Sequence, residues 1–275
     1  MKISALYRQI LQKQSFLCVG LDSDILKIPD FLKSEADPVF EFNKRIVEAT
    51  ADYAVAYKPN TAFYEALGAN GWRSLERTAE YIKTHYPDMY LIADAKRGDI
   101  GNTSKLYARA FFEQMPFDAV TVAPYMGSDS VKPFLEFPDK QVILLALTSN
   151  SGSADFQKIL DSDNTALYRS VIRKSLAWAD EEQLMYVVGA TRTEDIADIR
   201  EIVPEHFLLV PGVGAQGGNL QAVLKHGLNR RGGLLINSSR GILFADNSRS
   251  FELAARTEAQ KLRTQMIHAA GNFFS

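Results

Sequence analysis

YLIADAKRGDIGNT, residues 90–103, is the stretch that says most about the fold. Its first part is a continuous apolar run, which is typical of a strand buried on both faces. Asp94, Lys96 and Asp99 follow, and then a glycine and a segment of helical character. Burying an unpaired charge is costly, so several charges at the end of a buried strand predict either an ion-pair network or a chemical site.

The same unit of a short apolar run followed by a helical pattern recurs along the chain. Eight such runs lie at 16–20, 53–57, 89–93, 119–123, 142–147, 184–188, 207–210 and 234–237. Asp37-Pro38 is typical of a helix start, and 166–179 and the tail from Ser250 also have helical patterns. This alternation predicts an α/β protein with one (β/α)₈ barrel (a TIM barrel) as a single domain over residues 1–275. A doubly wound sheet is the alternative.

The composition narrows the class of protein. The chain has 275 residues, of which 46% are hydrophobic, and its formal net charge is −2. It therefore lacks the basic field that a nucleic-acid or anionic membrane partner would need. Cys18 is the only cysteine, which excludes an internal disulfide and fits a reducing cytoplasm. The longest apolar run, Val142 to Leu147, is far too short to span a bilayer.

Polar residues follow most of the predicted strands. In a (β/α)₈ barrel the active site lies at the carboxyl ends of the strands, so these residues are expected to converge. They are Asp22 after the first strand, Lys58 and Asn60 after the second, Asp94 and Lys96 after the third, Thr148 and Ser149 after the fifth, and Arg240 after the eighth. A single charge after a strand is more often a helix cap or a solvated loop residue, and the number of strand ends involved favours a site.

The last two strand ends are typical of a phosphate site. Gly212, Gly214, Gly217 and Gly218 would let main-chain N–H groups approach an anion, and Arg240 would supply a bidentate donor. The alternative is that these glycines only form tight turns.

Asp94 and Lys96 lie two residues apart, so on a strand they share a face, and Lys58 can join them from the neighbouring strand. A lysine flanked by carboxylates keeps its proton and can act as a general acid. A carboxylate beside the reacting group can favour loss of an anionic substituent, although stabilisation of the developing carbanion by the ammonium can matter more. The alternative is a structural ion-pair network at the barrel rim.

DAKRGDIGNT, residues 94–103, resembles the motif after the third strand of the orotidine 5′-phosphate decarboxylases. Its KRGDI segment, residues 96–100, is similar in sequence to the longer bacterial subfamily. GLDSD (20–24), AYKPN (56–60), PGVGAQGG (211–218) and SSRGI (238–242) follow in the expected order. The resemblance implies conversion of orotidine 5′-monophosphate to UMP and CO₂ in de novo pyrimidine biosynthesis, without a metal or organic cofactor.

The resemblance also implies roles for individual residues. Lys96 would protonate the C6 carbanion, Asp94 would lie beside the departing carboxylate, Lys58 would join the charge network and bind the ribose, and Asp22 would bind a ribose hydroxyl. Asp99, with Ile100 and Thr103, would serve the active site of the partner subunit, so the resemblance implies a homodimer.

Further substrate contacts come from the later strands. Ser149 would hydrogen-bond the pyrimidine, with Thr148 or Ser151 as alternatives, and Gln216 would bridge pyrimidine and phosphate. Arg240 and main-chain N–H groups near Gly218 and Ser239 would hold the phosphate, and Pro211 is a further substrate-binding candidate. The segment 149–164 and the Gln216 loop are expected to close over the ligand as lids.

Three other functions remain open from the sequence. A sister sugar-phosphate decarboxylase or aldolase would need Mg²⁺ and an added acidic ligand near the second strand, for which Glu65 is the available residue. A Schiff-base aldolase would use Lys58 or Lys96 with a depressed pKa, which flanking carboxylates oppose. A non-catalytic nucleotide-binding barrel would keep Arg240 and the glycine loop but would need neither Asp94 nor Lys96.

Overall fold

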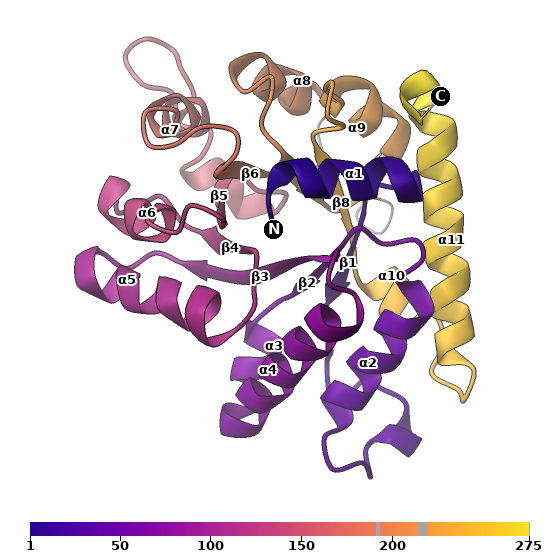
Figure 1. The fold of residues 1–275 in the computed structure, drawn as a ribbon. Helices are drawn as coiled ribbons and strands as arrows, with labels where there is room; N and C mark the ends of the chain where they lie inside the picture. The colour runs from indigo at the N-terminus through magenta and orange to yellow at the C-terminus, as the bar shows by residue number, and fades with distance from the viewer. Residues whose placement is uncertain (191–192, 214–218, 275) are drawn as a thin grey trace.

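The computed structural model describes residues 1–190, 193–213 and 219–274. Its strands are parallel and pair in chain order, and the last pairs with the first to close a barrel (Figure 1). They are β1 (Leu17–Leu21), β2 (Ala56–Pro59), β3 (Tyr90–Arg97), β4 (Ala119–Val122), β5 (Gln141–Leu147), β6 (Leu184–Val188), β7 (Leu208–Pro211) and β8 (Leu234–Ser238). The closed barrel confirms the predicted (β/α)₈ fold, whereas a doubly wound sheet would be open.

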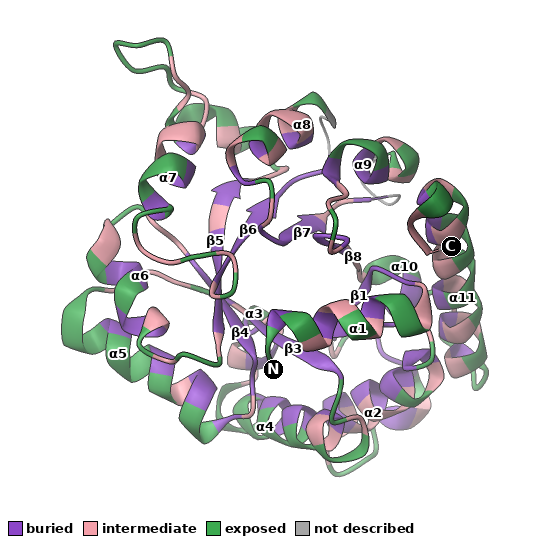
Figure 2. Ribbon diagram, turned by 45° about the horizontal axis from the view of Figure 1, so that its top comes forward, coloured by how far each residue is buried: buried purple, intermediate pink, exposed green. Residues whose placement is uncertain are grey.

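The helices lie outside the barrel, most of them in a ring around it (Figure 2). They are α1 (Ile3–Lys13), α2 (Pro38–Thr50), α3 (Ala62–Glu65), α4 (Gly68–His85), α5 (Gly101–Arg109), α6 (Ser128–Leu135), α7 (Leu167–Ser175), α8 (Thr193–Ile202), α9 (Leu220–Gly227), α10 (Arg240–Leu243) and α11 (Phe251–Ala269). A π-helical turn (Ala110–Gln114) extends α5, and 3₁₀ turns occupy Asp30–Leu32, Ser151–Asp155 and Gly271–Phe274.

The strands are apolar along their length because both of their faces are covered. Every residue of β1, β2, β4 and β6 is buried, with one face toward the barrel interior and the other toward the helices. The purple strands and the green outer faces of the helices in Figure 2 show this layering.

Helix α2 begins where the sequence predicts. The Asp37 carboxylate accepts a hydrogen bond from the Phe40 amide at 3.1 Å, and Pro38 occupies the first helical position. Asp37 thereby satisfies one of the amide groups that a helix start leaves without a partner. Phe42 and Ile46 face inward and are fully buried.

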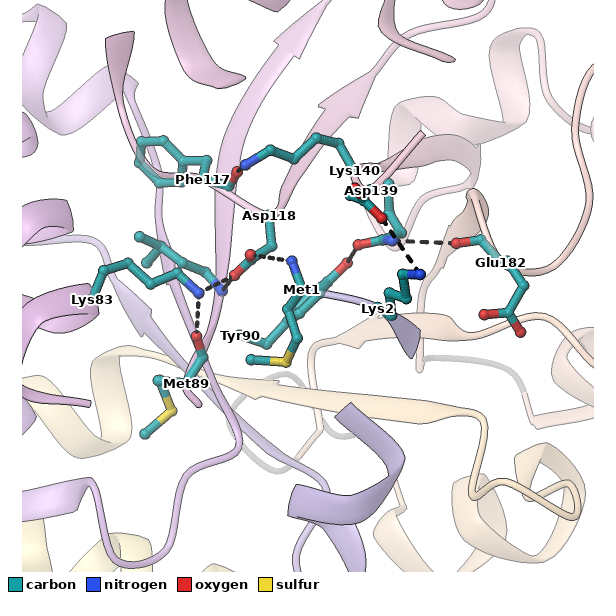
Figure 3. A network of polar contacts seen from close by, with 12 residues as sticks. Met1, Lys2, Lys83, Met89, Tyr90, Phe117, Asp118, Asp139, Lys140 and Glu182 are labelled. Atoms are coloured by element: carbon teal, nitrogen blue, oxygen red, sulfur yellow. Dashed lines mark hydrogen bonds and ion pairs between the residues drawn. The ribbon is translucent and has the colours of Figure 1, made fainter. Parts of the chain in front are cut away.

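Helix α1 closes the amino-terminal end of the barrel (Figure 2). Its Ile3, Leu6 and Ile10 side chains are fully buried, whereas its outer face is exposed. A buried carboxylate, Asp118, lies just before β4 under the start of this helix. It accepts hydrogen bonds from the Met1 ammonium at 2.6 Å and from Lys83 at 2.5 Å (Figure 3).

The Asp118 cluster explains how charges are tolerated at the buried amino-terminal end of the barrel. A buried carboxylate is costly unless it is paired and hydrogen-bonded, and Asp118 has two cations and the Leu91 amide (2.9 Å) as partners. Helix α1 and this cluster thus cover the amino-terminal end of the barrel. Among the described residues, no helix has the length and apolar character needed to cross a bilayer.

Candidate active site

A chain of alternating charges lies where β2 and β3 end. One oxygen of Asp94, Oδ2, accepts a hydrogen bond from Lys58 Nζ at 2.8 Å, and the other, Oδ1, accepts one from Lys96 Nζ at 2.6 Å. The two strands are neighbours, and the bridge between Asn60 and Asp94 continues their pairing to this end. The three side chains that the sequence placed at these strand ends therefore meet.

Asp22 extends the chain toward β8. Its Oδ1 lies 3.9 Å from Lys58 Nζ, and its Oδ2 accepts a hydrogen bond from Ser239 Oγ at 2.7 Å. The barrel places β1 between β2 and β8, which is why a residue near the start of the chain meets one near its end. The charged groups thus form a continuous line across the ends of three neighbouring strands, and the Ser239 hydroxyl continues this line to β8.

Burial and pairing act against each other in this line. Burial alone would raise the pKa of Asp94, but the Lys58 and Lys96 ammonium groups outweigh it and hold that pKa well below its usual range. Burial alone would lower the pKa of Lys58, but the Asp94 and Asp22 carboxylates outweigh it and raise that pKa well above its ordinary value. Both groups therefore stay charged at neutral pH.

Lys96 extends from an irregular part of β3. The register between β3 and β4 shifts between Ala93 and Arg97, and Lys96 has a φ of +47°. A left-handed backbone at a non-glycine residue costs on the order of 1 kcal/mol and persists only where the surroundings hold it. Here the Lys96 amide donates to the Thr121 hydroxyl of β4 at 2.9 Å. The Lys96 side chain is half exposed, and its ammonium contacts Asp94.

A cavity of about 400 Å³ opens beside these charges. It is lined by Asp22, Lys27, Lys58, Phe63, Asp94, Pro211, Gly212, Val213, Asn237, Ser238, Ser239 and Arg240. Four residues predicted to bind substrate, Asp22, Pro211, Ser239 and Arg240, are thus brought to the same space as Asp94. Gly212 has a φ of 91°, a conformation that favours glycine. Gly214, Gln216, Gly217 and Gly218 lie outside the described residues.

The remaining part of the motif lies away from this cavity. The Asp99 carboxylate accepts a hydrogen bond from the Ile100 amide at 2.8 Å. Among the described residues Asp99 forms no ion pair, whereas Asp22 and Asp94 both do. Ile100 and Thr103 are exposed on the loop before α5 and on its first turn. Within one chain, Asp99 therefore does not complete the charge line.

Ser149 lies at the end of β5 in a separate, smaller cavity. This cavity measures about 190 Å³, and Thr148, Ser149 and Ser151 all line it. The Thr148 hydroxyl donates to Asn150 Oδ1 at 2.6 Å and accepts from Gln157 Nε2 at 2.9 Å. The structure thus brings all three pyrimidine-contact candidates together but does not bring them into the cavity beside Asp94.

Glu65, the acidic residue considered as a metal ligand, is engaged elsewhere. Its carboxylate accepts a hydrogen bond from Arg97 at 2.5 Å, and the Arg97 guanidinium stacks over Tyr107, 5.1 Å from its ring centre. Within residues 1–190, 193–213 and 219–274, no group of three or more histidine, cysteine, aspartate or glutamate side chains is arranged to hold a metal ion.

Two polar residues within the strands of this region were not identified from the sequence. Thr121 bonds both Asp94 and Lys96, and Asn237 lines the cavity with a buried Oδ1 that has no hydrogen-bond partner among the described residues. Thr121 interrupts the apolar run AVTVA (119–123), and Asn237 ends the run LLIN (234–237) inside β8. A polar side chain inside a buried strand needs a partner, and this was the signal that could have identified them.

Comparison with known proteins shows which family the chain is similar to. A family model described as "Orotidine 5′-phosphate decarboxylase / HUMPS family" matches residues 15–251. An orotidine 5′-phosphate decarboxylase of Bacteroides fragilis is 59% identical over 266 residues, which cover 97% of each chain. That of Flavobacterium johnsoniae is 58% identical over 274 residues, with 100% of each chain covered.

The solved structures agree with this assignment. The structure of Leishmania donovani OMP decarboxylase shares 37% sequence identity and superposes with a TM-score of 0.80, covering 96% of this chain and 100% of its own. The match therefore extends over the whole barrel and both of its ends. The chain belongs to the orotidine 5′-phosphate decarboxylase / HUMPS family.

Proposed function

We propose that the protein decarboxylates orotidine 5′-monophosphate to UMP and CO₂, the last step of de novo pyrimidine synthesis. The observation that carries the proposal is the Lys58–Asp94–Lys96 chain, of which Lys58 and Asp94 line the cavity. The whole-length similarity to proteins named orotidine 5′-phosphate decarboxylase supports the same conclusion.

Binding begins with the phosphate in this proposal. The Arg240 guanidinium and the main chain around Ser239 receive the phosphate at the ends of β7 and β8, where Gly212 leaves the backbone accessible. Asp22 and Lys58 then lie on the path from phosphate to pyrimidine and bind the ribose hydroxyls. Binding energy from the phosphate holds the ring against Asp94 and Lys96, so a remote contact contributes to the chemical step.

The chemical step exchanges a carboxylate for a proton at C6. The bond between C6 and the carboxylate carbon breaks, CO₂ leaves, and the electron pair stays on C6. The Lys96 ammonium stabilises this pair and then donates its proton, which forms the C6–H bond of UMP. Asp94 keeps its negative charge beside the departing group because Lys58 still pairs with its other oxygen. All atoms and electrons balance without a metal or organic cofactor.

The competing functions have less support. A Schiff-base lysine needs a depressed pKa, but the pKa of Lys58 is raised. An Mg²⁺-dependent sister enzyme would need Glu65, which pairs with Arg97. A non-catalytic binding barrel would not need the Asp94–Lys96 ion pair. In this chain the pair is formed by a lysine, Lys96, whose backbone has an unfavourable positive φ.

A direct assay distinguishes these functions. Purified protein is expected to remove the orotate absorbance of orotidine 5′-monophosphate equally with and without EDTA. Loss of activity in EDTA that Mg²⁺ restores would contradict the cofactor-independent mechanism. Tight UMP binding without turnover would favour the non-catalytic barrel instead.

We also propose that the active form is a homodimer in which Asp99 completes the partner's site. Asp99 forms no ion pair among the described residues of its own chain, although it lies three residues from Lys96. Apolar side chains are exposed on this loop and on the adjacent one after β4, namely Ile100 (47%), Tyr125 (87%) and Met126 (53%). Exposed apolar groups of this kind favour a protein interface beside Asp99.

Replacing Arg240 by alanine is expected to raise the KM for orotidine 5′-monophosphate and the Kd for UMP by about 10- to 100-fold. A charge-assisted contact to phosphate contributes roughly 1.5–3 kcal/mol, which corresponds to this range. Steady-state kinetics and calorimetry measure the two constants. Arg230→Ala is the matched control because Arg230 is exposed and pairs with Glu205. Arg230 lies before β8, at the end of the barrel opposite the site. An Arg240→Ala protein with unchanged UMP affinity would exclude Arg240 from the phosphate site.

A further inference from the structure

Thr121 is a fully buried threonine in the middle of β4, and its hydroxyl connects two residues of β3. It accepts a hydrogen bond from the Lys96 amide at 2.9 Å and donates one to Asp94 Oδ1 at 3.0 Å. A hydroxyl has one proton to donate, and here that proton goes to the carboxylate. Thr121 thus contacts both the backbone of the proposed proton donor and the carboxylate that the donor pairs with.

The irregular register of β3 creates the need for this hydroxyl. The ladder between β3 and β4 is interrupted between Ala93 and Arg97, so the Lys96 amide does not pair with a main-chain carbonyl of β4 in the regular pattern. Regular pairing resumes when the Ala123 amide donates to the Arg97 carbonyl at 2.7 Å. The Thr121 hydroxyl replaces the missing acceptor at the one residue of β3 that has a positive φ.

The same hydroxyl also fixes the orientation of Asp94. Asp94 Oδ1 accepts from Thr121 and from Lys96 Nζ, while Oδ2 accepts from Lys58 Nζ. Both lysine contacts come from flexible side chains, whereas the threonine is stiff at χ1 and is held inside a strand. Thr121 is therefore the rigid member of the three donors around the carboxylate.

We propose that Thr121 is a positioning residue for the decarboxylation, an inference that rests on the function proposed above. Its hydroxyl holds the backbone from which Lys96 extends and holds Asp94 beside the leaving carboxylate. When Lys96 donates its proton to C6, its amine becomes neutral and the ion pair with Asp94 Oδ1 is lost. The Thr121 hydroxyl remains on Oδ1 throughout this step, so the carboxylate keeps its place while its partner changes charge.

Thr121→Val removes the hydroxyl with almost no change of shape and suits a strand. We expect it to lower kcat by about 10- to 100-fold, because small misplacements of reacting groups have effects of this size. The KM and the Kd for UMP are expected to change by less than about threefold, because the phosphate and ribose contacts remain. Thr121→Ser keeps the hydroxyl and is expected to restore most of kcat.

Thr50→Val is the matched control. Thr50 is also a fully buried threonine with two hydrogen bonds, to the Ile46 carbonyl at 2.7 Å and to the Tyr57 hydroxyl at 2.8 Å. Tyr57 and Lys58 are successive residues of β2, so their side chains leave opposite faces of the strand. Thr50→Val is expected to lower the melting temperature but to leave kcat and KM unchanged. If removing any buried hydroxyl group lowered kcat, kcat would fall in both variants.

A second readout does not depend on turnover. Hydrogen exchange at the Lys96 amide, measured by NMR, is expected to accelerate in Thr121→Val and to stay slow in Thr121→Ser and Thr50→Val. If the wild type does not decarboxylate orotidine 5′-monophosphate, the proposed function fails, and this measurement still tests the link between Thr121 and Lys96. Unchanged exchange, or a Thr121→Val enzyme with the kcat of the wild type, would overturn the inference. If Thr121→Val does not fold, Thr121→Ala and Thr121→Ser are compared by the same two readouts.

Discussion

Lys96→Ala is expected to lower kcat by on the order of 10⁴-fold, the upper part of the range for a positioned general acid. Of the two lysines that bond Asp94, Lys96 has the more exposed side chain, at 49%, and we assign it as the proton donor to the ring. Lys58, the other cation on Asp94, is almost fully buried. We therefore expect no other side chain to replace the lost proton donor.

The substitution should leave the fold and the ligand site largely intact. Asp94 keeps Lys58 and Thr121 as partners, at 2.8 and 3.0 Å, so its carboxylate is not left unpaired. The Kd for UMP, measured by calorimetry, is expected to stay within about threefold of the wild type because Arg240 and Asp22 are unchanged. Lys261→Ala is the control, since Lys261 also pairs with a carboxylate, Glu258, but lies on the outer helix α11. A Lys96→Ala enzyme that keeps more than about a tenth of the wild-type kcat would exclude Lys96 as the proton donor.

Mixing Lys96→Ala and Asp99→Ala proteins is expected to restore activity that neither has alone. In a mixed dimer, the Asp99→Ala subunit has its own Lys96 and receives Asp99 from its partner, so one of the two sites is complete. Random exchange between the two variants leaves about one site in four complete, which sets the expected recovery. Turnover is measured after incubation, and native mass spectrometry confirms that the subunits have exchanged.

A different pair of variants serves as the control for this experiment. Asp94 and Lys96 belong to the same chain's charge line, where they meet at 2.6 Å. Mixed dimers of Asp94→Asn and Lys96→Ala therefore contain no complete site and are expected to stay inactive. Recovery in both mixtures would show that the assay reports something other than shared sites. No recovery in the first mixture after proven exchange would contradict the dimer proposal.

Most of the fold could be predicted because the barrel repeats a simple pattern. Each of the eight apolar runs contains or overlaps a strand, since a strand covered on both faces has to be apolar along its length. The second run is the least accurate, because 53–57 predicts a strand that the structure places at Ala56–Pro59. Tyr53 instead belongs to the turn that follows α2, where its amide bonds to the Thr50 carbonyl. An apolar side chain packs equally well in a turn and in a strand.

The site was only partly accessible to sequence reasoning. The meeting of Lys58, Asp94 and Lys96 follows from the rule that parallel strands end at one edge. The expectation that Asp94 and Lys96 share a face relied on regular two-residue alternation, but the structure has an irregular register and a positive φ at Lys96. Such an irregularity depends on the neighbouring strand, and a single chain segment does not encode it locally. Thr121 could have been noticed as a polar residue in an apolar run, but its contacts with Asp94 and Lys96 depend on this irregular register.

The stretch 226–233 is another feature whose role depends on tertiary contacts. Its Gly227 and Gly233 carbonyls accept hydrogen bonds from the Arg200 guanidinium, at 2.6 and 3.0 Å, and Arg231 pairs with Glu182. Burial lowers the pKa of Arg200 to about 10, and these carbonyls satisfy its donors. The stretch therefore connects α9 to β8 at the end of the barrel opposite the site.

The pairing of β1 with β8 has a consequence for the nascent chain on the ribosome. β1 cannot acquire its second neighbour until residues 234–238 have been synthesised, about 220 residues later. At roughly 5–20 residues per second, this delay is on the order of 10–45 s. During that time the amino-terminal half displays an unpaired strand edge, to which a chaperone or another unfinished chain can bind. The last strand to be translated is thus the one that removes the exposed edge.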